Sequence, residues 1–241
     1  MLRTLIPLLL ASASLVHAQG AKEAQALFEA MEAKLAAAKT LKASFSSLMG
    51  PEGGQLEFKA ELLFGEGDLT KFEVKATTPD GMPVEMSLVS DGNQTRMRQV
   101  EGEKVKDDVQ PTPPNQGKLI RDAFSRLSIV AALFMVRVDK DDDAPLAVEN
   151  FSLGAKERDG ERSLQVIEFD TVAEHGSFRV KLWIDTVTGL PAKRELSNDE
   201  RAKAIVETYT AIELDPTLPE GAFDLSDAEA KPEAPSPKPA K

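Results

Sequence analysis

The spacing of apolar side chains changes several times along the chain, and each change predicts a different element. Over residues 24–41 apolar side chains recur at i, i+3, i+4 and i+7, which predicts an opening helix with one buried stripe. From residue 56 the period falls to two, because Leu56–Phe64 alternates apolar with polar side chains, as a strand with one solvated face does. Short turns then separate further alternating segments, which predicts an antiparallel meander. The remaining strands are expected at residues 71–76, 84–88, 95–100, 148–155, 163–170, 177–185, 192–196 and 201–214.

The middle of the chain breaks this alternation. After a proline-rich loop at residues 110–117, the segment Leu119 to Val138 is helix-like and apolar on more than one face. Such a helix must be buried on several sides, so we expect it inside a curved sheet or between layers. The pattern therefore predicts one α+β domain with about nine to eleven antiparallel strands, a terminal helix and a buried central helix.

The two ends of the chain have compositions of their own. Residues 1–18 combine Arg3, a short run rich in leucine and alanine, and a cleavage pattern, which predicts a signal peptide cleaved after Ala18. The alternative, a retained N-terminal anchor, would need a longer apolar run to span a bilayer. Residues 227–241 are rich in proline and hold no large apolar side chain, which predicts a disordered tail. We therefore expect an exported protein whose folded domain spans residues 19–226.

Charge and the absence of cysteine narrow the range of partners. The chain has 29 Lys and Arg against 40 Asp and Glu, a formal net charge of −11, which becomes −12 once Arg3 is removed with the signal. Such a field repels nucleic acid and anionic lipid headgroups, so we expect neither as an electrostatic partner. Without any cysteine there is no lipoprotein anchor, disulfide or thiolate metal site. We expect a monomer with no stable membrane anchor.

Residues that could perform catalysis or bind a metal are few. His175 is the only histidine after the predicted signal peptide. It lies within Ala173–Gly176, a segment typical of a solvated hairpin tip. The acidic run Asp139–Asp143 lacks the glycine and the final glutamate of a calcium-binding loop, so a solvated loop is the better interpretation. No phosphate-binding or nucleophile motif is present, and no carboxylate pair can be chosen without geometry. We therefore predict a non-enzymatic protein with no cofactor and no metal site.

The apolar residues say more about function. One-faced strands and an over-apolar helix fit a curved sheet wrapped around that helix. Two interpretations stay open at this point: the core is simply filled, or sheet and helix leave an apolar cleft between them. An acyl chain buried in such a cleft would contribute about 0.8 kcal/mol per methylene group.

Several segments, taken together and in order, resemble the periplasmic lipoprotein carrier family, LolA and its relatives. They are the helix-to-strand junction Thr40–Ser46, the hairpin Val89–Gln94, the pair Val180–Asp185 and Thr188–Lys193, and the ending Leu218–Phe223. This resemblance implies an open antiparallel β half-barrel with helices plugging its concave face. It also implies a periplasmic protein that binds the acyl chains of lipoproteins and carries them across the periplasm.

We accordingly expect a periplasmic, non-enzymatic protein that binds a lipid or acylated ligand in an apolar half-barrel cavity. The rival interpretation is an envelope protein-interaction or sensor module with the same fold and a filled core. A hydrolase built on carboxylates would need two acidic residues facing each other in a cleft. The expected cavity lining consists of Phe58, Leu62, Phe64, Phe72, Val74, Met86, Leu88, Phe124, Leu127, Phe134, Phe178, Val180, Leu182 and Ile184.

Overall fold

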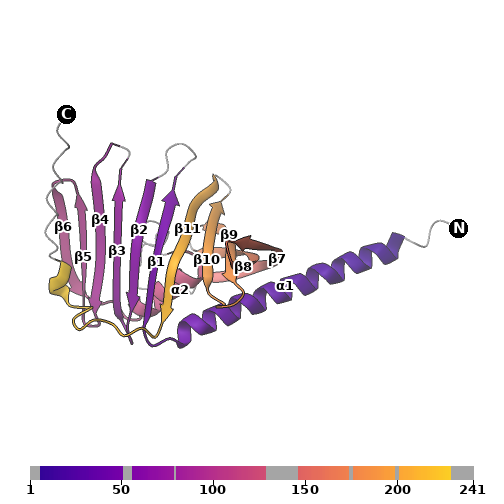
Figure 1. Cartoon of the computed structure of the whole chain (residues 1–241), viewed down its shortest axis with the longest axis horizontal. Coiled ribbons are helices and arrows are strands. Elements are labelled where there is room, and N and C mark those ends of the chain that lie inside the picture. The colour runs from indigo at the N-terminus through magenta and orange to yellow at the C-terminus, as the bar shows by residue number, and fades with distance from the viewer. Residues whose placement is uncertain are drawn as a thin grey trace.

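Figure 1 shows the computed structural model of the chain, an open antiparallel sheet with two helices. The structure describes residues 6–50, 56–78, 80–128, 146–173, 176–198 and 201–228. Within these ranges only the backbone is described at residues 6–17, 173, 176, 198, 201–204, 227 and 228. The elements are α1 (Ile6–Ala37), β1 (Leu41–Met49), β2 (Leu56–Phe64), β3 (Leu69–Thr77), β4 (Pro83–Asp91), β5 (Gln94–Glu101), β6 (Lys104–Pro111), α2 (Gln116–Arg126), β7 (Ala147–Asp159), β8 (Arg162–Ala173), β9 (Gly176–Asp185), β10 (Pro191–Asn198), β11 (Arg201–Leu214) and the 3-10 helix η1 (Leu225–Ala228).

The chain runs from the middle of the sheet to one edge, and then from the other edge back to the middle. Its 11 strands lie in the order β6-β5-β4-β3-β2-β1-β11-β10-β9-β8-β7, so β6 and β7 are its two edges (Figure 1). The chain meanders from β1 to the β6 edge, passes through α2, and resumes at the opposite edge with β7. It then meanders back until β11 pairs with β1, from Leu41 opposite Leu214 to Met49 opposite Ile205. The sheet is therefore open, and its central pair joins the two halves of the chain.

One face of the sheet carries most of the apolar core. In β2 the side chains of Phe58, Ala60, Leu62 and Phe64 are buried, while those of Glu57, Lys59 and Glu61, which alternate with them, are exposed. The pairing register places the apolar residues of neighbouring strands on this same face, where they form one cluster with both helices. We call it the inner face and the opposite one the outer face.

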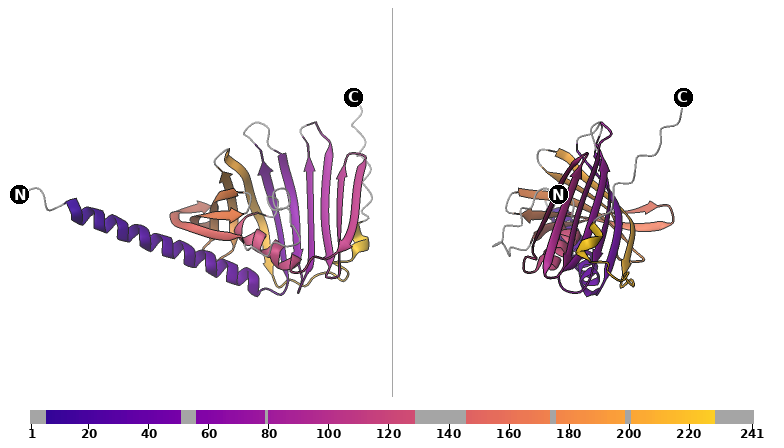
Figure 2. Two further views of the ribbon diagram at one scale, coloured as in Figure 1. Left: turned by 180° about the vertical axis from the view of Figure 1, so that it is seen from behind. Right: turned by 90° about the vertical axis from the view of Figure 1, so that its left-hand side faces the viewer.

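The two helices enter the core cluster from different parts of the chain. Ala24, Phe28, Met31 and Leu35 of α1 are buried in it, and the Phe28 ring lies 4.8 Å from that of Phe169 in β8. The backbone of α1 continues to Ile6, through the segment expected to be a signal peptide, and extends away from the sheet (Figure 2). In the part of the chain that the structure describes, no helix is long and apolar enough to cross a membrane.

The central helix differs from the prediction. Helix α2 begins at Gln116 and ends at Arg126, whereas the apolar pattern predicts a helix over residues 119–138. Leu127 and Ser128 are buried but not helical, and residues 129–138 lie outside the described residues. The opening helix also ends earlier than its apolar stripe, because Leu41 is already the first residue of β1.

The strand count agrees with the expected range, although two strands had no clear pattern in the sequence. The first is β1, most of which falls in the expected helix-to-strand junction Thr40–Ser46. The second is β6, whose sequence KVKDDVQP is exposed throughout. The hairpin expected within Val89–Gln94 is confirmed between β4 and β5. A second hairpin joins β7 and β8, where Asp159 pairs with Arg162.

The C-terminal segment leaves β11 and reaches η1, which lies against β4 and β5. Arg96 of β5 donates a hydrogen bond of 2.7 Å from its NH1 nitrogen to the Leu225 carbonyl oxygen. Residues 227 and 228 of the predicted tail are therefore part of η1, and residues 229–241 lie outside the described residues.

Candidate ligand-binding face and the cleft between the helices

The described residues among those predicted to line a cavity lie on the inner face of the sheet or, for Phe124 and Leu127, in and directly after α2. All of those that the structure describes belong to one apolar cluster. Met86 and Phe178 are partly buried, the other described members are buried, and Phe134 lies outside the described residues. Two of them, Phe64 and Phe124, also line an open cleft.

The cover of the inner face is uneven across the sheet. Phe72 and Val74 in β3 are buried. In β4, Met86 lies opposite Val74 and Val84 lies opposite Ala76, and both β4 side chains are only partly buried. In the next strand Met97, which pairs with Leu88, is 40% exposed. The apolar surface of the inner face thus reaches β5 at Met97, whose neighbours on that face of the strand are Thr95 and Gln99.

A cleft of about 310 Å³ lies between α1 and α2. Its apolar wall includes Leu35, Leu41, Phe64 and Phe124, and its polar wall consists of Glu29, Glu32, Arg121, Asp122, Ser125 and Arg126. This volume is at the lower end of the range typical of small-ligand pockets.

The N-terminus of α2 is fixed to the sheet by polar contacts. The Gly117 N–H donates to the Asp68 carboxylate at 2.8 Å, which satisfies one of the free amide groups of a helix start. The buried Gln116 side chain accepts a hydrogen bond of 2.7 Å from the Thr95 hydroxyl. Gly117 is required here, because a Cβ atom would lie 2.5 Å from the Gly67 carbonyl oxygen.

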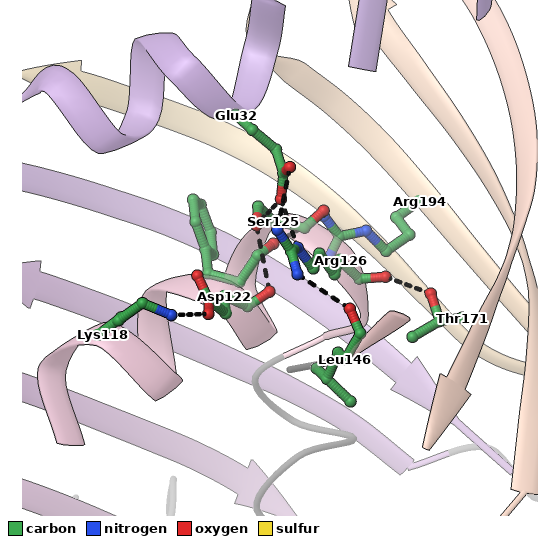
Figure 3. A network of polar contacts seen from close by, with 9 residues as sticks. Glu32, Lys118, Asp122, Ser125, Arg126, Leu146, Thr171 and Arg194 are labelled. Atoms are coloured by element: carbon green, nitrogen blue, oxygen red, sulfur yellow. Dashed lines mark hydrogen bonds and ion pairs between the residues drawn. The ribbon is translucent and has the colours of Figure 1, made fainter. Parts of the chain in front are cut away.

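The C-terminus of α2 is fixed by Arg194 of β10. This side chain is fully buried on the inner face, and its guanidinium donates to the carbonyl oxygens of Phe124, Ser125 and Leu127 at 2.7, 3.1 and 2.9 Å. A cation at this position both satisfies the free carbonyl groups of the last turn and interacts favourably with the helix dipole. Figure 3 shows Arg194 reaching the end of the helix from the sheet.

A buried carboxylate accompanies this arginine. Glu207 of β11 lies opposite Arg194, with 3.5 Å between its Oε2 and the NH1 nitrogen. It also accepts hydrogen bonds from the Ser128 hydroxyl and, at 2.8 Å, from the Tyr209 hydroxyl. Burial is the main reason why the pKa of Tyr209 is raised well above its usual value, so the phenol remains a neutral donor.

A second polar contact joins the two helices beside the cleft. Arg126 of α2 donates from Nε to Glu32 of α1 at 2.7 Å and from NH1 to the Leu146 carbonyl oxygen at 3.0 Å (Figure 3). The Ser125 hydroxyl donates to the same carboxylate at 2.8 Å. The hydrogen bond with Glu32 raises the pKa of Arg126, so this arginine is a paired cation.

Sequence reasoning missed the pair Arg194 and Glu207, although a signal was present. In β10 Arg194 stands two residues before Leu196 and so shares its apolar face, and Glu207 takes the corresponding place between Ile205 and Tyr209. A charge at a position that the period assigns to the core predicts a buried ion pair.

The arrangement offers hydrophobic contact and fixed charges. Among the described residues, no group of three or more histidine, aspartate or glutamate side chains is placed to hold a metal ion. His175 and the acidic run Asp139–Asp143 lie outside the described residues.

The fold has similar solved structures. No protein-family profile matches the chain, and no curated protein is similar to it in sequence. The chain is similar to LprF from Mycobacterium bovis (11% identity, 82% of this chain and 96% of that chain, TM-score 0.48). It is also similar to a LolA superfamily protein, NE2245 from Nitrosomonas europaea (12% identity, 85% and 98%, TM-score 0.33), and to MucB (13% identity, 85% and 63%, TM-score 0.39). The chain therefore spans 63% of the length of the matched MucB chain. The resemblance to LolA-like proteins concerns the fold, and at these values it identifies no ligand.

Proposed function

We propose that the chain is a non-enzymatic, periplasmic protein that binds the acyl chain of a lipid or lipoprotein on the inner face of a half-barrel sheet. In this proposal both helices plug the concave side, and the predicted cavity residues form its apolar lining. The observation that carries it is the continuation of apolar side chains from the enclosed core to the partly exposed Met86 and Met97.

The energetics favour binding through apolar contacts. Burial of hydrocarbon contributes about 0.8 kcal/mol per methylene group, so even part of a long acyl chain placed along β3 to β5 would yield useful affinity. The net charge of −11 gives no general attraction for anionic lipids. An acyl chain that binds through contacts with apolar side chains uses the free energy of hydrocarbon burial and needs no basic surface.

The arrangement of α2 limits how a ligand could enter. Asp68 and Thr95 hold the N-terminus of the helix and Arg194 its C-terminus. We therefore place the ligand on the inner face beside α2, toward β4 and β5, rather than beneath a displaced α2.

The test compares two exposed residues on neighbouring strands and opposite faces of the sheet. Met97→Asp introduces a charge on the inner face, and Val105→Asp, at a side chain that is 54% exposed, introduces the same charge on the outer face. We expect Met97→Asp to weaken binding of a fluorescent fatty acid methyl ester on the order of tenfold, because a carboxylate beside the chain would lose hydration. Val105→Asp should leave the affinity unchanged.

Lipid extracted from the purified chain and identified by mass spectrometry gives an independent measurement. Equal affinity of the two variants, with no lipid in the extract, would contradict the proposal.

That result would favour the alternative, an envelope protein-interaction or sensor module with a filled core. The aromatic packing supports this alternative: the Phe45 ring lies 5.4 Å from that of Tyr209, and the Phe151 ring 5.5 Å from that of Phe169. The interaction module predicts a periplasmic partner recovered by crosslinking, with no uptake of the methyl ester.

A further inference from the structure

The cleft between α1 and α2 holds two arginines of α2 in different electrostatic situations. Arg126 is paired with Glu32. Arg121 is half-buried, and within the described part of the chain its hydrogen bonds go to two backbone carbonyl oxygens, Gly65 at 2.8 Å and Ala38 at 3.4 Å. Burial lowers the pKa of Arg121, whereas Glu32 raises that of Arg126.

The carboxylates that line the cleft already have partners of their own. Glu32 accepts from Arg126 and Ser125, Asp122 pairs with Lys118 at 2.8 Å, and Glu29 accepts from the Gln25 amide at 2.8 Å. None of these contacts neutralises Arg121, so the cleft contains a cation that the described side chains leave without a counter-ion.

The guanidinium of Arg121 is also held in a fixed position. Its central carbon lies 4.5 Å from the centroid of the Phe64 ring, a cation–π contact that orients the planar group. A guanidinium has five N–H groups, and the two carbonyl contacts use only two of them. The group is thus preorganised to donate further hydrogen bonds toward the cleft.

We propose that this cleft is a binding site for an oxyanion that carries a short apolar chain, with Arg121 as the partner of the anion. A phosphate or carboxylate would form charge-assisted hydrogen bonds with the guanidinium, and the apolar chain would contact Leu35, Leu41 and Phe124. The volume of about 310 Å³ fits such a fragment and not a whole diacyl lipid. The site goes beyond the proposed acyl-binding function and stands on the cleft alone.

The test titrates the full chain with hexyl phosphate, hexanol and inorganic phosphate, and follows the Nε–H signal of Arg121 by NMR. Hexyl phosphate should shift this signal and bind more tightly than hexanol. Arg121→Gln should weaken hexyl phosphate binding on the order of tenfold, because the charged hydrogen bonds are lost. The matched control is Lys34→Gln, which removes the same charge from an exposed position of α1 that does not line the cleft.

The possible results separate the alternatives. Binding of inorganic phosphate that depends on Arg121 but gains nothing from the hexyl chain supports the oxyanion contact and assigns the ligand to free phosphate. The inference is overturned if neither phosphate compound shifts the Arg121 signal, or if Arg121→Gln and Lys34→Gln have equal effects. Should Arg121→Gln fail to fold, the wild-type titration alone decides. Loss of methyl ester binding, by contrast, bears on the proposed function and not on this site.

Discussion

At the scale of the residue, Arg194 shows how a charge can be placed in an apolar core. A buried charge is tolerated only when hydrogen bonds and an opposite charge replace its hydration. The last turn of α2 supplies carbonyl oxygens and Glu207 supplies the negative charge. The same contacts fix the end of α2, so one side chain both satisfies the helix terminus and attaches it to the sheet.

We expect Arg194→Met to lower the free energy of unfolding by about 3–5 kcal/mol, because it leaves Glu207 as an unpaired buried charge. Urea unfolding followed by circular dichroism measures this change. The control is Arg179→Met on the outer face, where the arginine is partly exposed and pairs with Glu168 and Asp170. That change should stay below about 1 kcal/mol, and similar losses in both variants would contradict the assigned role.

At the scale of the element, α2 is held at both ends by contacts from distant parts of the chain. Asp68 lies in the turn between β2 and β3, and Arg194 lies in β10. The helix is only 11 residues long, and isolated helices of that length are marginal in water. Its position therefore depends on these tertiary contacts.

Replacement of Gly117 tests how closely α2 approaches the turn. In Gly117→Ala the new Cβ atom would lie 2.5 Å from the Gly67 carbonyl oxygen and 3.0 Å from the Asp68 Cα atom, and backbone atoms cannot move aside easily. We expect a loss of about 1–3 kcal/mol. Gly20→Ala in α1 is the matched control: the nearest atom, Leu153 Cβ, is 3.6 Å away, so that change should be neutral or slightly stabilising. Equal stability of the two variants in thermal unfolding would contradict the close approach.

The elements that could be predicted are those whose burial follows a simple period. In β2 and β9 every second residue enters the core, so the alternation is visible in the sequence. In β6 no residue is buried, because it is an edge strand, and its sequence carries no period. In β1 the inner face includes Ala43 and Ser47, whose small side chains weaken the pattern.

The candidate site was predictable only in part for a related reason. The apolar lining follows from the same alternation, and the described members do lie in one cluster. Arg121 of α2 contacts the backbone at Ala38 and Gly65. The spacing of apolar and polar residues along the sequence does not predict such contacts between distant segments. The end of α2 at Arg126 likewise depends on Arg194, far along the chain.

At the scale of the whole molecule, the chain is acidic and several of its carboxylates are stabilised by folding. Backbone N–H groups of Gln94 and Asn93 lower the pKa of Asp91, and those of Thr188 and Val187 lower that of Asp185. A hydrogen bond from Arg96 lowers the pKa of Asp107. The folded state therefore binds fewer protons than the unfolded state in mildly acidic solution.

The consequence for stability has a definite sign. A carboxylate whose pKa is lower in the folded state than in the unfolded state stabilises the folded protein. This contribution is fully present when the pH is above the unfolded pKa, about 3.9 for aspartate. It is lost as the pH falls through the lower pKa of the folded state. We expect the free energy of unfolding to decrease as the pH falls below about 4. Asp185→Asn should make this decrease less steep in urea unfolding measured between neutral and acidic pH. Parallel curves for the variant and the parent chain would show that Asp185 contributes nothing to the slope.

The pairing of β1 with β11 also governs the order in which the molecule can be built. Leu41 and Leu214 are neighbours in the sheet but lie near opposite ends of the domain sequence. Each meander can form from local hairpins, yet the central strand pair must wait until β11 has been made, and such long-range pairing is slow. Until then β1 presents an unpaired edge, the kind of surface on which unfolded chains associate. A newly made chain would thus remain incomplete and dependent on protection from aggregation until its last strand arrives.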